Sequence, residues 1–297
     1  MTSIENKAAG ALVGLACGDA VGTTLEFIPK GSFTHITDMI GGGPFELPAG
    51  YWTDDTSMAL CLAESLIRNH GFDAKDQISR YCNWWKHGYL SSTGICFDIG
   101  ITVSSALEKF IATDEPYSGS TNKYSSGNGS IMRLAPIPIF YSQNIASCIK
   151  YAKDSSKTTH GSALCIDSCG WFSCLIFLAL NGYSKQAMLS DCQYHPYTEE
   201  VLALSSWNFL DKDWSQLEGS GYVIESLEAA LWCFFNTESF EEAILSAANL
   251  GNDADTTAAV CGQIAGAYYG LEGIPLAWQN RLYMRQEIID YALQLLK

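Results

Sequence analysis

Positively charged residues are scarce in this chain. Its 297 residues include 17 Lys and Arg against 32 Asp and Glu, which gives a net charge of −15. Binding to nucleic acid depends on clustered Lys and Arg, so we expect no nucleic-acid partner. Charged residues of both signs make up only 16% of the chain and hydrophobic residues 47%. This balance predicts a globular protein with a thick core rather than a disordered one.

Paired cysteines and long apolar runs are also missing. None of the eleven cysteines forms a CxxC motif, and Cys165, Cys169 and Cys174 lie in an apolar stretch without nearby zinc-ligand histidines. We interpret them as buried thiols and expect a reducing cytoplasm, of the protein's own cell or of a host. The longest apolar run, about Trp171 to Leu180, is roughly half of the ~20 residues that span a bilayer. The N-terminus has no basic segment of the kind that begins a signal peptide. We therefore expect no membrane insertion.

Strand-like alternation and long linkers are rare, whereas apolar residues recur at helical spacing. We predict an all-α fold with a single domain over residues 1–297, and we expect a monomer. The predicted helices cover residues 4–20, 56–69, 74–88, 99–112, 145–154, 162–181, 184–190, 198–209, 222–235, 239–249, 257–270 and 285–296.

Glycine recurs every fourth residue in two apolar segments. These glycines are Gly10, Gly14, Gly18 and Gly22 in the first segment and Gly262, Gly266 and Gly270 in the second. On a helix this spacing makes a flat stripe, which lets another backbone approach closely. Glycine inside a helix costs about 0.5–1 kcal/mol relative to alanine, so close packing of central helices must offset that cost.

Two motifs place paired carboxylates at the start of an Ala-rich helical segment. The first contains Asp54 and Asp55 within WTDDT, and the second contains Asp253 and Asp255 within GNDADTT. Ordinary N-capping requires only one such residue. Four carboxylates close together repel one another unless a cation offsets their charge, and Mg²⁺ or Mn²⁺ prefers oxygen ligands of this kind. The two motifs therefore predict one shared metal site.

Several further residues stand out less sharply. The segment Ser126–Arg133 (SGNGSIMR) could cradle a phosphate with its glycine-flanked N–H groups, or could be a plain Asn-Gly turn. Glu26 and Asp98 are acids among apolar and small residues, and each alone could be a cap or turn residue. His160 alone is typical of a hydrogen-bonded loop histidine, and we expect Asp19 to be structural.

Taken together, the motifs resemble the ADP-ribosylglycohydrolase family, and within it the bacterial dinitrogenase reductase-activating glycohydrolase type. The resemblance covers nearly the whole chain, except that residues 72–96, 112–124 and 183–218 carry no matching motif. The motifs are GLACGDAVGTTLEF (14–27), the glycine-rich loop at 41–50, WTDDT (52–56), FDIG (97–100), GNGSIMR (127–133), TTHG (158–161), GSGYVIESLEAALW (219–232) and GNDADTTAAVCGQIAGAYYG (251–270).

The resemblance implies a compact orthogonal helical bundle with a binuclear Mg²⁺ or Mn²⁺ centre in a cleft. The metal ligands that it implies are Thr53, Asp54, Asp55, Asp253, Asp255 and Thr256. It implies that Asn128, Gly129, Ser130 and Met132 hold a diphosphate and that His160 and Tyr222 line the ADP-ribose site. Glu26 and Asp98 would be the catalytic carboxylates. The metal motifs show no departure from the family pattern, so we expect an active enzyme.

The implied reaction is hydrolysis of the N-glycosidic bond between ADP-ribose and a protein side chain. Asp98 would stabilise the oxocarbenium-like transition state and help protonate the leaving group, and Glu26 would act as the base, although these roles could be exchanged. The acid in FDIG favours an arginine-linked substrate. Serine-linked or free ADP-ribose derivatives, a metal-dependent phosphohydrolase and a non-enzymatic ADP-ribose binding module remain open alternatives.

Overall fold

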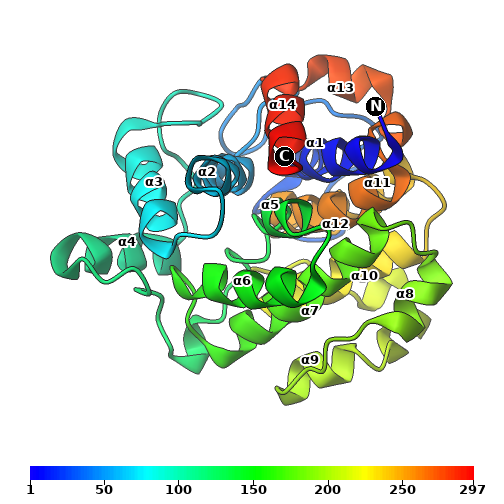
Figure 1. The fold of residues 1–297 in the computed structure, drawn as a ribbon. Helices are drawn as coiled ribbons and strands as arrows, with labels where there is room; N and C mark the ends of the chain where they lie inside the picture. The colour runs from blue at the N-terminus through cyan, green and yellow to red at the C-terminus, as the bar shows by residue number, and fades with distance from the viewer.

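Two apolar helices lie side by side and antiparallel in the middle of the molecule (Figure 1). They are α1 (Ser3–Gly22) and α12 (Ala254–Tyr269). A Cβ atom added at Gly14 would collide with the backbone carbonyl of Gly262, and one added at Gly18 would collide with that of Ala258. These contacts confirm the predicted close packing of central helices along the glycine stripe. On α12, alanines such as Ala258 continue the stripe.

This pairing decides where the two ends of the helices lie. The C-terminal end of α1 lies beside the first turn of α12, because a Cβ atom at Gly22 would lie 2.5 Å from the Cα atom of Asp255. Gly270 follows the end of α12 with a positive φ of 74°, where its backbone contacts Gly10 and a Cβ atom would meet the side chain of Asn6. Close helix packing thus brings Asp19 on α1 next to the Asp255 motif.

The other helices surround this central pair. They are α2 (Asp54–Asn69), α3 (Ala74–His87), α4 (Ile101–Thr113), α5 (Pro136–Phe140), α6 (Ile145–Lys157), α7 (Ala163–Leu180), α8 (Lys185–Asp191), α9 (Glu199–Leu204), α10 (Val223–Phe235), α11 (Phe240–Ala248), α13 (Leu276–Arg281) and α14 (Arg285–Leu295). Helices α10 and α11 pack on α12, α6 packs on α7, and α14 packs between α1 and α2. The computed structural model describes all 297 residues and contains no β-strand, only isolated bridges.

The all-α prediction is confirmed, but two short helices were not predicted. Helix α5 begins at Pro136 and contains Pro138, and prolines are usually taken as helix breakers. Proline is tolerated in the first turn, where its missing N–H would have no partner in any case. Helix α13 follows Pro275. Helix α9 ends at Leu204 rather than at the predicted 209, because the chain turns at Trp207 with a φ of 63°.

Two apolar helices are longer than the longest uninterrupted apolar run of the sequence. Ser3–Leu25 and Ala163–Leu180 are long and apolar enough to cross a bilayer. The most apolar part of the first is wholly buried inside the protein, and so is 78% of that of the second. The uninterrupted apolar run is shorter than helix α7, because α7 also contains buried polar residues such as Asp167 and Ser168. These segments therefore form the core.

Candidate active site

Asp19 holds the start of α2 against the end of α1. One carboxylate oxygen accepts hydrogen bonds from the N–H and hydroxyl of Thr53, at 2.8 and 2.9 Å. The other accepts from the N–H and hydroxyl of Thr56, at 3.0 and 2.6 Å. Burial raises the pKa of Asp19 to about 6, and these four hydrogen bonds oppose the rise. The structural role expected for Asp19 is thus visible in its contacts: it positions Asp54 and Asp55 in the first turn of α2.

The start of α12 is held by a pairing of two tight loops. The N–H of Phe27 donates to the carbonyl of Asn252 at 2.6 Å, and the N–H of Asn252 donates to that of Ile28 at 2.8 Å. Phe27 and Asn252 both have positive φ, 61° and 56°. Such conformations cost free energy and persist where the surrounding contacts require them. Glu26 precedes Phe27 in the chain, and Asp253 follows Asn252. The pairing of the two loops therefore fixes the backbone beside both acids.

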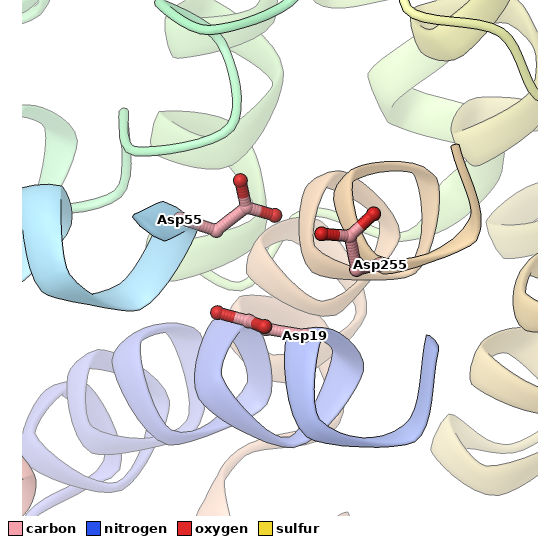
Figure 2. Close-up of side chains that lie close together, drawn as sticks. All are labelled: Asp19, Asp55 and Asp255. Carbon is pink, nitrogen blue, oxygen red and sulfur yellow. The ribbon is translucent and has the colours of Figure 1, made fainter. Parts of the chain in front are cut away.

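Three helices bring carboxylates to a common point. Asp19 comes from α1, Asp55 from α2 and Asp255 from α12, and their oxygens lie within 4.8 Å of one another (Figure 2). The hydroxyl of Thr53 donates to Asp255 at 3.3 Å, and that of Thr256 donates to Asp55 at 3.4 Å. The predicted grouping of both motifs is therefore present in the structure.

These carboxylates lack compensating positive charge from the protein. One oxygen each of Asp55 and Asp255 is buried without a hydrogen-bond partner. Burial, followed by the negative charge of neighbouring acids, raises the pKa values of Asp54, Asp55 and Asp255 well above the ordinary range. A divalent cation would satisfy the orphaned oxygens and remove the repulsion. Because the donors are all carboxylate and hydroxyl oxygens, the cluster suits a hard cation.

Glu26 and Asp98 form a second acidic group above this cluster. Their carboxyl oxygens and those of Asp255 lie within 4.8 Å of one another. Burial and then the charges of Asp255 and Asp253 raise the pKa of Glu26 to about 9. Burial and then the charge of Asp54 raise the pKa of Asp98 to about 11, and its hydrogen bond with Glu26 adds to this rise. Asp98 also has a φ of 60°, a strained conformation that is frequent at functional sites.

The loop at Gly127–Ser130 contributes Gly127, Asn128 and Gly129 to the same cleft as the acids. The N–H of Asn128 donates to the carbonyl of Gly221 at 3.0 Å, and its side-chain amide donates to Asp253 at 2.6 Å. The N–H groups of Gly129 and Ser130 make no hydrogen bond within the protein. Free, adjacent N–H groups of this kind suit an anionic oxygen. The side chain of Ser130 instead hydrogen-bonds with the hydroxyl of Ser156 and the thiol of Cys169 in the core, so it does not point toward a ligand.

These groups line one cleft of about 490 Å³. Most of the site residues predicted from the sequence lie on its wall, namely Glu26, Asp54, Asp98, Asn128, Gly129, Met132, His160, Asp253 and Thr256. Three of the predicted metal ligands, Thr53, Asp55 and Asp255, are buried in the core beside it. Tyr222 lines an adjoining hollow of about 760 Å³, which shares Thr102, Gly127 and Gly221 with the cleft.

Two residues in contact with the site were not singled out from the sequence. Thr159 hydrogen-bonds with the His160 ring at 2.8 Å, and Arg133 donates to Thr159 at 2.6 Å. Both lie inside motifs quoted above, GNGSIMR and TTHG. A motif does not distinguish a residue that faces the cleft from one that is buried behind it, so these two contacts could be found only in the structure.

Several known proteins are similar to this chain over most of its length. The family model described as ADP-ribosylglycohydrolase matches residues 1–297. ADP-ribosylarginine hydrolase Tri1 of Serratia proteamaculans (strain 568) is 43% identical over 98% of this chain and 79% of its own length. The ADP-ribosyl-[dinitrogen reductase] glycohydrolase of Rhodospirillum rubrum is 28% identical over 96% of this chain and 93% of its own length.

A solved structure has the same fold. It is described as an ADP-ribosylglycohydrolase-related protein complex, and it superposes with a TM-score of 0.87 at 40% sequence identity. The match covers 100% of this chain and 99% of the other. The family suggested by the sequence motifs is thus confirmed. Of the two relatives described, identity is higher with the arginine hydrolase than with the dinitrogen-reductase enzyme to which the motifs were compared.

Proposed function

The chain is a glycohydrolase of the ADP-ribosylglycohydrolase family, and we propose that the bond it hydrolyses joins ADP-ribose to an arginine side chain of a protein. One observation carries this proposal. A single cleft adjoins a buried cluster of carboxylates and hydroxyls that suits a divalent cation, and two further acids, Glu26 and Asp98, line the cleft together with the glycine loop, whose Gly129 N–H has no partner in the protein. The names of the similar proteins, an ADP-ribosylarginine hydrolase and an ADP-ribosyl-[dinitrogen reductase] glycohydrolase, support the choice of linkage.

Two divalent cations, Mg²⁺ or Mn²⁺, are the proposed cofactors. Their ligands would be Thr53, Asp54, Asp55, Asp253, Asp255 and Thr256. Both orphaned oxygens, on Asp55 and Asp255, belong to this set. Such cations, when bound, lower the pKa of a water molecule and orient the hydroxyl groups of a sugar.

The protein's own groups would bind the rest of the substrate in order along the cleft. The distal ribose would lie against the acids, and the diphosphate would accept hydrogen bonds from the free N–H groups of Gly129 and Ser130. Met132 and His160 would line the same stretch. The adenosine end would extend past Gly127 into the adjoining hollow, beside Tyr222. The two connected chambers suit a long ligand with a charged middle.

Hydrolysis requires one proton to be removed from water and one to be delivered to the departing guanidine. The pKa of Asp98 is raised further than that of Glu26, to about 11 against about 9. Asp98 is therefore the acid that more readily keeps a proton to deliver to the guanidine, and Glu26 is the one that more readily loses its proton and serves as the base once cations offset the neighbouring negative charge. A carboxylate here also stabilises the positive charge that develops on the sugar.

The proposed partner is a cytoplasmic protein that carries ADP-ribose, and we propose that the enzyme acts as a monomer. All eleven cysteines are free thiols, which supports a reducing compartment. The three cysteines of α7 are buried, in agreement with their interpretation as core residues.

The test is to incubate the protein with an arginine-modified and, in parallel, a serine-modified substrate, with Mg²⁺, Mn²⁺ or EDTA, and to measure released ADP-ribose. We expect metal-dependent release from the arginine substrate. Release of inorganic phosphate would support the phosphohydrolase alternative. Tight ADP-ribose binding without any release would support the binding-module alternative.

A further inference from the structure

Arg133 is a fully buried cation without a carboxylate partner. It is the only Lys or Arg whose side chain is completely buried. Its guanidinium donates to Thr159 at 2.6 Å and to Thr158 at 3.5 Å, lies 4.5 Å from the centre of the Tyr81 ring, and leaves Nε without a partner. Burying a charge is expensive unless another interaction offsets the cost. A function near Arg133 would explain why it is there.

The contact with Thr159 decides the direction of the next hydrogen bond. A guanidinium can only donate, so the hydroxyl oxygen of Thr159 must accept from Arg133. The hydroxyl hydrogen then needs an acceptor, and the one within reach is Nδ1 of His160, at 2.8 Å. If Nδ1 carried a proton instead, the buried hydroxyl hydrogen would have no acceptor, which costs free energy. The proton of the neutral imidazole therefore belongs on Nε2.

His160 itself is held firmly but leaves Nε2 unpartnered. The side chain is 2% exposed, its N–H donates to Ser156 at 2.7 Å, and its carbonyl accepts from the Ser156 hydroxyl at 2.8 Å. A Cβ atom added at Gly129 would lie 3.1 Å from Nε2, and one added at Gly127 would lie 3.6 Å away. Nε2 thus faces the glycine loop on the wall of the cleft. Burial, with a smaller effect of the Arg133 charge, lowers the pKa of His160 to about 3, so the ring is neutral.

We propose that Arg133 and Thr159 are positioning residues that hold the proton of His160 on Nε2, where it donates a hydrogen bond to a diphosphate oxygen of ADP-ribose. This inference rests on the proposed function for the identity of the ligand. The donor would act beside the free N–H groups of Gly129 and Ser130. The Arg133 charge behind the loop favours an anion at the same place. The neighbouring acids otherwise give this cleft a strongly negative character.

The first experiment determines by NMR which ring nitrogen of His160 carries the proton in the ligand-free protein. Long-range ¹H–¹⁵N spectra distinguish the two ring nitrogens of each of the five histidines, and His160→Gln identifies the signals of His160. We expect a proton on Nε2 and none on Nδ1 in the wild type and in Thr159→Ser, which keeps the hydroxyl. In Thr159→Val the preference should be lost. Thr158→Val is the matched control, because it removes a hydroxyl near the same guanidinium without touching His160.

The second experiment measures the affinity of the Mg²⁺-loaded protein for ADP-ribose by calorimetry. Thr159→Val should weaken binding about tenfold, which is the effect of losing roughly one hydrogen bond. Thr159→Ser should restore the affinity, and Thr158→Val should not lower it. A purely structural role would lower the melting temperature of Thr159→Val without changing either the tautomer or the affinity.

The outcomes separate this inference from the proposed function. A wild-type His160 with its proton on Nδ1 would overturn the inference, and so would an unchanged affinity in Thr159→Val when the wild type cleaves its substrate. A wild type that neither binds ADP-ribose nor releases it would overturn the proposed function, and the ligand assigned to Nε2 would fail with it.

Discussion

At the scale of single residues, we propose that some acids of the site hold a cation and that others act on the substrate. Asp55 and Asp255 are fully buried between helices and have orphaned oxygens. Asp98 instead lies on a loop before α4, is partly exposed and has a positive φ. Each acid alone resembles a cap or turn residue, so the two proposed roles rest on the way the fold groups these acids in and beside one cleft.

The assignment of Asp98 predicts a specific kinetic loss. Asp98→Asn should lower kcat about 10²–10⁴-fold, the usual contribution of an acid–base group, with little change in stability. Asparagine tolerates the left-handed backbone, so the loop should keep its shape. Asp114→Asn is the matched control, because Asp114 follows the other end of α4 with a φ of 58° and is exposed. Equal kcat values for Asp98→Asn and Asp114→Asn, measured by ADP-ribose release, would contradict the assignment.

The sequence predicted which residues contribute to the cleft better than it predicted the direction of their side chains. The sequence motifs correctly placed Asn128 and His160 on the cleft wall, but they did not show that the Ser130 side chain points into the core. Nor did they single out Thr159 and Arg133. Side-chain direction in an irregular loop depends on the elements packed behind it, which local sequence does not reveal.

At the scale of elements, the close contact of α1 with α12 brings the buried acids together. The stripe of small residues allows the two backbones to touch, and this contact brings Asp19 beside Asp255. Asp19 then fixes α2, which carries Asp54 and Asp55. The periodic glycines made this packing predictable. The short helices α5 and α13 were not predictable in the same way, because proline-containing segments of five or six residues carry no periodic signal.

This arrangement predicts that Gly14→Ala is strongly destabilising. The new methyl group would meet the carbonyl of Gly262, and backbone atoms cannot move aside as a flexible side chain can. We expect a loss of about 3 kcal/mol in the free energy of unfolding, at the upper end for an overpacked core. Gly100→Ala provides the control, since a Cβ atom there would meet nothing within 4 Å. If urea denaturation gave the two variants the same stability, the close packing of α1 on α12 would be in doubt.

At the scale of the whole molecule, a small group of acids is buried although most acidic residues lie nearer the surface. The chain has a net charge of −15, and several of its acids are buried around one cleft. The raised pKa values mean that the folded metal-free protein holds protons that the unfolded chain releases. Between the ordinary carboxyl range and the values of about 6, 9 and 11 for Asp19, Glu26 and Asp98, the folded state binds more protons. Its stability must then fall as pH rises.

The metal-free protein should therefore lose stability progressively from about pH 4 to about pH 11. Bound cations replace those protons, so the stabilisation by Mg²⁺ should increase over the same interval. Chemical denaturation in EDTA and in Mg²⁺ at each pH measures both effects. Asp255→Asn should show a smaller stabilisation by Mg²⁺ at high pH. A metal-induced stabilisation that is constant with pH would argue against a buried carboxylate site.

The proposed reaction depends most on a binuclear metal centre formed by the converging acids. The most direct test is to count Mn²⁺ ions bound per chain by equilibrium dialysis and elemental analysis, with wild type and the Asp55→Asn and Asp255→Asn variants side by side. We expect two Mn²⁺ ions in the wild type and fewer in each variant. A wild type that binds none, or variants that bind as many ions as the wild type, would contradict the claim.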